Sequence, residues 1–346
     1  MDWVSLPDEV NDLVNSLTLY NGKMIAGGHF TNAGSTNANK IAAWDGTNWS
    51  SLGNGLSGGF NPYVYKTMVF NNELYTVGNF DSAGTVATKD IAKWNGSAWF
   101  GFGSGSNAAI YSISAFNNEI YVGGTFDTIG GIPAKHIAKW NGLNWQALGS
   151  GVQGNNVNDM YVFQNELYII GVFDSVGNVP CNNVARWNGI AWNNASSGID
   201  YGSSALTIEN NKLLAGSQGT LISSTFYQQI KQWDGNNWIS FSQQQMIPVR
   251  AFINFNSSLY CSGGTGTGPI GGSNVMVWDS TLATWTVVGT GVNNYIQGLC
   301  VFNNELYCGG YFKKSTGGYH NYIARYGNIS GINEVKESYI FTIKPN

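Results

Sequence analysis

The sequence predicts an all-β protein made of repeated four-stranded antiparallel sheets, and three observations lead to that prediction. A pair of tryptophans around a short turn recurs along the chain, an Asn-rich turn motif precedes each pair, and the first Trp of each pair advances by about 45 to 50 residues, which is the period of four-stranded propeller blades. A ring of such sheets packs each apolar face against a neighbour. The pattern therefore predicts a β-propeller. The pairs are Trp44 and Trp49, Trp94 and Trp99, Trp140 and Trp145, Trp187 and Trp192, Trp233 and Trp238, and a looser copy at Trp278 and Trp285.

The Asn-rich motif sets the number of repeats. It reads Phe70-Asn-Asn-Glu-Leu-Tyr75 in one unit and Phe302-Asn-Asn-Glu-Leu-Tyr307 in another, and weaker copies bring the total to seven. Each unit then contains strand A, the Asn-rich hairpin, strand B, a loop, strand C ending in Trp, a second turn, and strand D starting with Trp. We expect the seven A strands to begin at Val14, Val64, Ile110, Val157, Ser203, Val249 and Ile296.

The turn between strands C and D contains Asn-Gly or Asp-Gly, as in Trp94-Asn-Gly-Ser-Ala-Trp99. Because these dipeptides accept the positive φ angles of a type I′ turn, we expect C and D to be adjacent and antiparallel. The tryptophans should fill the widening outer gap between blades. Replacing Trp94 or Trp140 with Ala should then cost about 3–5 kcal/mol of stability.

The two ends of the chain predict how the ring closes. Trp3-Val-Ser-Leu6 matches a D strand with no strands before it, and Tyr322-Ile-Ala-Arg-Tyr326 matches a C strand with no D strand after it. We therefore expect a seven-bladed propeller in residues 1–327 whose last blade is completed by the N-terminal strand, since an open edge would invite aggregation. Residues 328–346 form a separate C-terminal tail.

Composition excludes several classes of function. Only 10% of the 346 residues are charged, and the formal net charge is −4 with no Lys/Arg cluster, which argues against nucleic-acid partners. The sequence contains no run of about 18 apolar residues, so it does not predict membrane insertion. The N-terminus lacks the regions of a signal peptide, so the protein is either cytosolic or a chain whose leader is missing. The four cysteines (Cys181, Cys261, Cys300 and Cys308) are too few and too irregular for a disulfide framework, and we expect them to be free.

With Gly123-Gly124 and Gly309-Gly310 closing strand B and a Trp after the C–D turn, the repeat resembles the kelch type of β-propeller. Kelch propellers bind proteins, bind glycans, or act as enzymes such as galactose oxidase, so the resemblance does not fix the function. Residues 331–346, ending in Phe341-Thr-Ile-Lys-Pro-Asn346, resemble the start of the C-terminal sorting domain of type IX secretion. The resemblance implies an extracellular or cell-surface protein; an ordinary amphipathic tail strand is the alternative.

The face that carries the B–C and D–A connections is the candidate binding surface, because its loops vary between copies while the opposite turns repeat. Around its central opening, the second position of each A strand differs from blade to blade. Aromatic, amide and charged side chains of this kind suit sugar rings and protein side chains. The predicted ligand-binding residues are Tyr63, Tyr65, Lys66, Tyr111, Asn158, Asp159, Arg250, Tyr295 and Gln297.

These residues predict a secreted or surface binding module for an extracellular glycan or protein, without cofactor, metal or catalytic residue. Three alternatives stay open: the polar residues simply cap a wet channel, the chain is a purely structural scaffold, or it is a carbohydrate-active lyase or hydrolase acting at the channel mouth. Chemistry is disfavoured because the three histidines, His29, His136 and His320, lack metal-ligand spacing and Asp159 has no evident acid–base partner.

Overall fold

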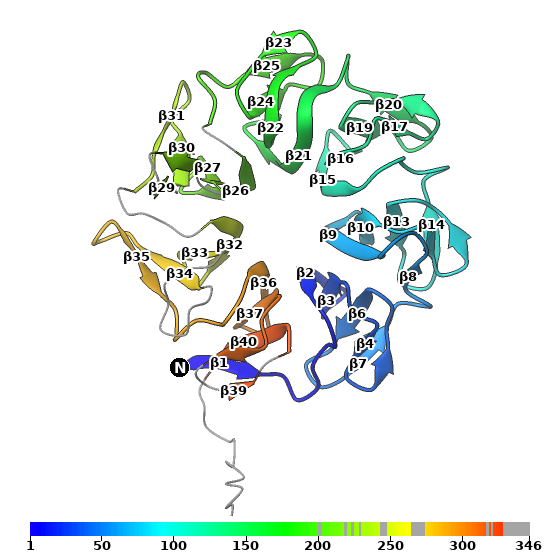
Figure 1. Cartoon of the computed structure of the whole chain (residues 1–346), viewed down its shortest axis with the longest axis vertical. Coiled ribbons are helices and arrows are strands. Elements are labelled where there is room, and N and C mark those ends of the chain that lie inside the picture. The colour runs from blue at the N-terminus through cyan, green and yellow to red at the C-terminus, as the bar shows by residue number, and fades with distance from the viewer. Residues whose placement is uncertain are drawn as a thin grey trace, which may run out of the picture.

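The computed structural model describes residues 1–199, 202–217, 220–222, 225–227, 230–242, 248–263, 274–315, 318–319 and 321–327. Over these residues the chain is built from β-strands, and four-stranded antiparallel sheets are arranged radially around a central opening (Figure 1). The prediction of an all-β propeller is confirmed. The predicted tail, 328–346, lies outside the described residues, as does His320.

Each main sheet has the same order, with its first strand innermost. From the innermost to the outermost strand, the sheets are β2 (Val14–Tyr20), β3 (Lys23–Gly28), β6 (Ile41–Trp44), β7 (Trp49–Ser51); β9 (Tyr63–Phe70), β10 (Glu73–Asn79), β13 (Ile91–Trp94), β14 (Trp99–Gly101); β15 (Ile110–Phe116), β16 (Glu119–Gly124), β19 (Ile137–Trp140), β20 (Trp145–Ala147); β21 (Val152–Phe163), β22 (Glu166–Val176), β24 (Val184–Trp187), β25 (Trp192–Asn194); β26 (Ser203–Glu209), β27 (Lys212–Ser217), β30 (Ile230–Trp233), β31 (Trp238–Ser240); β32 (Val249–Phe255), β33 (Ser258–Gly263), β34 (Val275–Asp279), β35 (Thr284–Val287); and β36 (Ile296–Phe302), β37 (Glu305–Gly310), β40 (Ile323–Gly327), β1 (Asp2–Ser5).

The N-terminal strand β1 is the outer strand of the sheet that contains the C-terminal strands. It pairs antiparallel with β40, and Trp3 lies opposite Tyr326. The Trp3 indole donates to the Val288 carbonyl of the preceding sheet at 3.1 Å. The innermost strands contact one another around the ring, and β36 contacts β2.

Short two-stranded hairpins lie in the connections between second and third strands. They are formed by β4 (Asn32–Ala33) with β5 (Thr36–Asn37), β11 (Ser82–Ala83) with β12 (Val86–Ala87), β17 (Thr128–Ile129) with β18 (Ile132–Pro133), β28 (Thr220–Ile222) with β29 (Thr225–Tyr227), and β38 (Lys314–Ser315) with β39 (Gly318–Tyr319), while β23 (Val179–Pro180) pairs with the end of β22 and β8 (Leu56–Ser57) pairs with β11. The residues that precede the predicted start of β21 also pair with β22, so this strand begins at Val152 rather than at the predicted Val157. Tyr63 likewise starts β9 one residue early.

Two classes of turn close the sheets at the end that we call the turn face. The hairpins between first and second strands have two residues with positive φ, as at Asn71 and Asn72, which is the type I′ geometry. The expected two-residue turn at Asn303-Asn304 places Cys300 opposite Tyr307. All four cysteines are free, as predicted.

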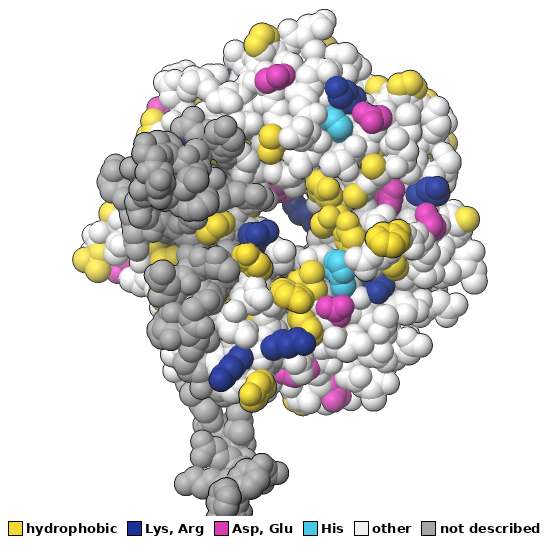
Figure 2. All heavy atoms as spheres, in the orientation of Figure 1, with side chains coloured by type: hydrophobic (Ala, Val, Ile, Leu, Met, Phe, Trp, Pro, Cys, Tyr) yellow, Lys and Arg dark blue, Asp and Glu magenta, His cyan; other side chains and the backbone are white. Residues whose placement is uncertain are grey.

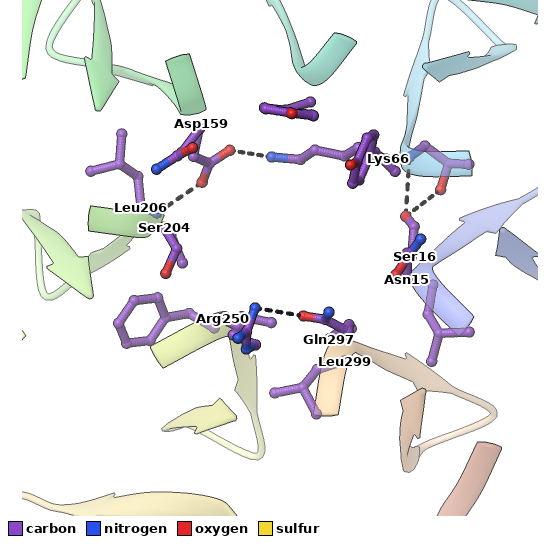
Figure 3. Close-up of a pocket in the computed structure, with 18 of the residues that line it drawn as sticks. Asn15, Ser16, Lys66, Asp159, Ser204, Leu206, Arg250, Gln297 and Leu299 are labelled. Atoms are coloured by element: carbon purple, nitrogen blue, oxygen red, sulfur yellow. Dashed lines mark hydrogen bonds and ion pairs between the residues drawn. The ribbon is translucent and has the colours of Figure 1, made fainter. Parts of the chain in front are cut away.

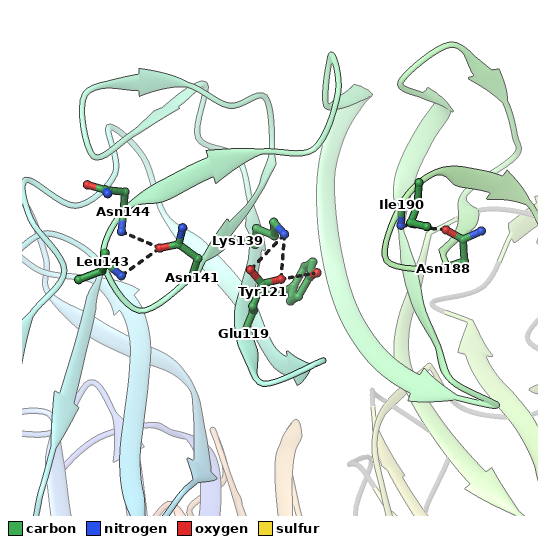
Figure 4. A network of polar contacts seen from close by, with 8 residues as sticks. All are labelled: Glu119, Tyr121, Lys139, Asn141, Leu143, Asn144, Asn188 and Ile190. Atoms are coloured by element: carbon green, nitrogen blue, oxygen red, sulfur yellow. Dashed lines mark hydrogen bonds and ion pairs between the residues drawn. The ribbon is translucent and has the colours of Figure 1, made fainter.

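The type I′ prediction is wrong for the turns between third and fourth strands. In the turns that contain Asn-Gly or Asp-Gly only the glycine has positive φ, as at Gly142, and the preceding Asn141 side chain accepts backbone N–H bonds from Leu143 and Asn144 at 3.0 and 2.9 Å (Figure 4). The loop therefore has four residues and is held by the Asn side chain, a local bond that Asn and Asp form readily.

The core lies between neighbouring sheets. One buried cluster combines Ile25 and Ile41 of the first sheet with Val64 and Leu74 of the next. The fourth-strand tryptophans are buried in every pair, and Trp99, for example, is 6% exposed and donates to the Leu52 carbonyl of the preceding sheet at 2.8 Å. The third-strand Trp94 and Trp140, which the sequence singled out, are half-buried.

Candidate functional site

A β-bulge shapes the start of every innermost strand, at the end of the channel that we call the mouth. In each strand one residue near the predicted strand start is skipped between two paired neighbours; Tyr111, for instance, is skipped between Ile110 and Ser112, and Asn158 between Val157 and Asp159 within the longer strand β21. A bulge leaves its extra residue unpaired and redirects the side chain. The bulged residues, all of which line one cavity, are Asn15, Tyr65, Tyr111, Asn158, Ser204, Arg250 and Gln297.

Glycine stands opposite these bulges on the second strand of every main sheet except the fifth, where Ser217 takes its place. A Cβ at Gly124 would lie 2.2 Å from the Ala109 carbonyl oxygen, and one at Gly310 would lie 2.0 Å from that of Tyr295. A side chain at either of these two positions would push the incoming chain away from the sheet. The Gly-Gly motif therefore has a direct role in presenting the bulged residues to the channel.

The cavity at the mouth has a volume of about 480 Å³. Figure 2 shows the central opening and a group of side chains coloured as hydrophobic beside it. The inner ends of all the main sheets contribute to the lining, so the cavity lies on the axis of the ring (Figure 3).

Three of the bulged side chains join neighbouring sheets. Asn15 donates to the Val64 carbonyl at 2.7 Å, Asn158 donates to the Ser203 carbonyl at 3.0 Å, and Ser204 donates to the Val249 carbonyl. In each case the acceptor is the first paired or adjacent residue of the next innermost strand. Asn158, a predicted binding residue, therefore links two sheets as well as lining the cavity.

One side of the mouth is an aromatic wall formed by His29, Tyr63, Tyr65 and Tyr111. The His29 ring stacks on Tyr63 at 4.5 Å, Tyr63 meets Tyr65 edge-on at 4.5 Å, and Tyr65 meets Tyr111 edge-on at 4.6 Å. The Tyr63 and Tyr65 hydroxyls are hydrogen-bonded at 2.8 Å. Burial raises the pKa of Tyr63 and Tyr65 and lowers that of His29, so these three side chains are uncharged near pH 7.

A further aromatic side chain stands in the loop next to the wall. Phe60 is 95% exposed. Its backbone carbonyl accepts a hydrogen bond at 3.1 Å from the side chain of Asn79, and Asn79 is the residue that pairs with Tyr63 in the sheet. A large apolar side chain held this far into solvent is a common feature of contact surfaces.

The opposite side of the mouth carries Arg250. Its Nη1 donates to the Gln297 side-chain oxygen at 3.3 Å, and its Cζ lies 4.9 Å from the centre of the Tyr295 ring. The Arg250 Nε is buried and has no hydrogen-bond partner among the residues described. Burial lowers the pKa of the guanidinium from its usual value.

An ion pair crosses the cavity between non-neighbouring sheets. Lys66 of β9 pairs with Asp159 of β21, and the Leu206 backbone N–H donates to the other Asp159 oxygen at 2.9 Å (Figure 3). The Asp159 side chain is 8% exposed. Asp159 is the acidic residue of the cavity lining, and both of its oxygens are engaged.

The structure thus brings together seven of the nine predicted residues in one lining: Tyr65, Lys66, Tyr111, Asn158, Asp159, Arg250 and Gln297. Tyr63 and Tyr295 lie just outside that lining and pack against Tyr65 and Arg250. Sequence reasoning missed His29 and Phe60 as members of the surface. A signal for His29 exists, because the position between the strand-B glycine and Phe holds His29, Asn79, Thr125, Val172 or Tyr311 in different repeats.

Two searches of the described residues concern other kinds of site. No three His, Cys, Asp or Glu side chains in the described ranges gather closely enough to hold a metal ion. Within the same ranges, no helix has the length and apolar character needed to cross a membrane.

Solved structures share the architecture. The crystal structure of the WD40 β-propeller domain of Doa1 aligns with a TM-score of 0.57 at 10% sequence identity, covering 91% of this chain and 93% of that chain. The computationally designed Ika8 protein aligns with a TM-score of 0.53 at 12% identity, covering 94% and 98%. No family model and no curated protein matches the sequence. At these identities the likeness shows the fold alone, a β-propeller, and not the function.

Proposed function

We propose that the chain is a seven-bladed propeller, closed by β1, that acts as a non-catalytic binding module and holds a glycan at the channel mouth. The observation that carries the glycan proposal is the aromatic wall of His29, Tyr63, Tyr65 and Tyr111. Aromatic faces and edges bury the C–H patches of a sugar ring, while the amides and charges around them bond its hydroxyls.

Binding is favoured over catalysis by the state of the acidic group in the cavity. Glycoside hydrolysis ordinarily uses two carboxyl groups on either side of the scissile bond. The cavity lining contributes Asp159, whose two oxygens are occupied by Lys66 and the Leu206 N–H. This arrangement supports a fixed structural carboxylate rather than a proton donor.

Glycan-array binding followed by calorimetry tests the proposal with a matched pair of variants. Tyr111→Ala removes one ring of the wall, and Phe100→Ala removes a partly exposed ring of the outer strand β14. We expect Tyr111→Ala to weaken saccharide binding by about tenfold, since an aromatic contact contributes about 0.5–1.5 kcal/mol beyond its buried area, and Phe100→Ala to leave binding unchanged. Equal affinities for both variants and the parent, or binding of a protein ligand alone, would refute the glycan proposal.

The extracellular location is a separate prediction. It rests on the resemblance of residues 331–346 to the start of a sorting domain. Immunoblotting of the medium, the cell surface and the cell interior with an antibody to the propeller checks it; retention of the chain inside intact cells would contradict it.

A further inference from the structure

The two cations at the mouth are in different electrostatic situations. Lys66 is neutralised by Asp159. Arg250 takes part in no ion pair among the described residues; its polar contacts there are the neutral Gln297 side chain and the Tyr295 ring. Among the described residues that line the cavity, Arg250 is therefore the positive charge without an ionic partner, although the whole chain has a formal net charge of −4.

The surroundings of Arg250 make its positive charge energetically unfavourable, because the guanidinium is partly removed from water without full compensation. A guanidinium offers five N–H donors, of which one bonds Gln297, while Nε is buried without a partner in the described part of the chain. Partial removal of a charge from water is unfavourable unless an opposite charge or further hydrogen bonds compensate. An oxyanion that reached the exposed part of this guanidinium would supply both.

The position of Arg250 relative to the aromatic wall sets the shape of the ligand. Arg250 belongs to β32 and Gln297 to β36, whereas the three tyrosines of the wall belong to β9 and β15, which lie across the central opening from β32 (Figure 1). A ligand that satisfies both sides has an apolar ring face and an anionic group attached to it. A sugar ring bearing a carboxylate or a sulfate ester has this combination.

From this arrangement we infer that the mouth selects acidic glycans and that Arg250 binds their anionic group. The inference rests on the proposed glycan binding and adds the class of sugar. Arg is suited to this task because its planar fork matches the paired oxygens of a carboxylate.

The test compares each acid with its own neutral form. A panel of glucuronic, galacturonic and mannuronic oligosaccharides is titrated into the protein by calorimetry, together with the methyl ester of each and with sulfated galactose oligosaccharides. We expect at least one acid to bind about tenfold or more tightly than its ester, because hydrogen bonds to charged groups contribute about 1.5–3 kcal/mol. Added salt should weaken binding of the acid and leave that of the ester unchanged.

Three variants assign the effect to Arg250. Arg250→Gln should reduce the affinity for the acid to that for the ester, without changing the ester. Arg186→Gln removes the same charge from the turn-face end of β24, where Arg186 pairs with Glu166 at 2.9 Å, and should preserve the preference. Unchanged thermal unfolding of Arg250→Gln confirms that the variant is folded, and Arg250→Lys should restore part of the preference.

The outcomes separate the two proposals. Ester and acid binding equally, or Arg250→Gln weakening both equally, would overturn the acidic-glycan inference while leaving glycan binding intact. A sulfated sugar that binds best and depends on Arg250 supports the inference and identifies the sulfate ester as the anion. If none of the sugars binds and the glycan array is also empty, both proposals fail.

Discussion

The two ends of the channel differ in how strictly the repeats agree. At the turn face, four of the sheets repeat one contact: the Glu of the Asn-rich hairpin pairs with a Lys or Arg of the third strand, as in Glu119–Lys139 at 2.8 Å (Figure 4) and Glu73–Lys93 at 2.8 Å. At the mouth, the bulged residue changes from Asn15 to Tyr65 to Arg250. The difference supports the proposal that repeated residues build the fold and that varied residues carry binding.

The largest expected effect tests whether the N-terminal strand is equivalent to an internal outer strand. Trp3 is fully buried and Trp99 nearly so, and each donates to a carbonyl of the preceding sheet. Trp3→Ala and Trp99→Ala should each cost about 3–5 kcal/mol, measured by urea unfolding. A loss below about 1 kcal/mol for Trp3→Ala alone would mean that β1 does not complete the ring.

The second-largest effect is expected from a substitution next to one of the bulges at the mouth. Gly310→Ala brings a Cβ to within 2.0 Å of the Tyr295 carbonyl oxygen, and we expect a loss of about 1–3 kcal/mol together with weaker ligand binding, because the start of β36 must move. Gly327→Ala is the control, since its nearest neighbour would lie at 3.5 Å. Wild-type stability of Gly310→Ala in urea unfolding would contradict the steric explanation.

A pH-dependent contribution comes from Asp90, which is buried under the mouth-side connections. Its carboxylate accepts from the Phe80 N–H at 3.1 Å and from the Ser106 hydroxyl at 2.7 Å, and burial raises its pKa to about 6. Because the folded state binds this proton more tightly than the unfolded state, the favourable contribution is full below pH 4 and is lost as the pH rises towards 6.

Asn183 occupies the equivalent position and bonds the Phe173 N–H with its oxygen at 3.1 Å. Asp90→Asn should therefore keep the fold and, relative to the parent, be more stable at pH 7 than at pH 4 by on the order of 1 kcal/mol. Thermal unfolding at both pH values measures this. A difference between variant and parent that does not change with pH would contradict the assignment.

The smallest effect is expected at the turn face. Glu119 pairs with Lys139 and accepts from the Tyr121 hydroxyl at 3.3 Å, but both ion-pair side chains are partly exposed. Glu119→Gln should cost about 0–1 kcal/mol in urea unfolding and should leave ligand binding unchanged. Loss of binding in this variant would reverse the roles that the comparison assigns to the two ends.

Much of the architecture could be predicted because the same residue types recur at the same positions of each repeat. The Trp pairs located the third and fourth strands, and the Asn-rich turns located the first and second. The turn type between Trp140 and Trp145 could not be predicted from Asn-Gly alone, since the Asn141 side chain, rather than its φ angle, closes the loop.

The site was predicted only in part, for a physical reason. Differences between copies identified Tyr65, Tyr111 and Arg250, but the bulges that turn them inward arise from close packing of glycine against a carbonyl, which is a property of three dimensions. The pairing of Lys66 with Asp159 joins residues 93 positions apart on non-neighbouring sheets. No local pattern encodes such a contact.

The most direct test of the central claim is a crystal structure of the protein with the tightest-binding saccharide from the array. The account predicts density for a sugar ring against Tyr65 and Tyr111 at the mouth, with the turn face unoccupied. Density for the sugar at the turn face or along the outer strands, with the mouth empty, would contradict it.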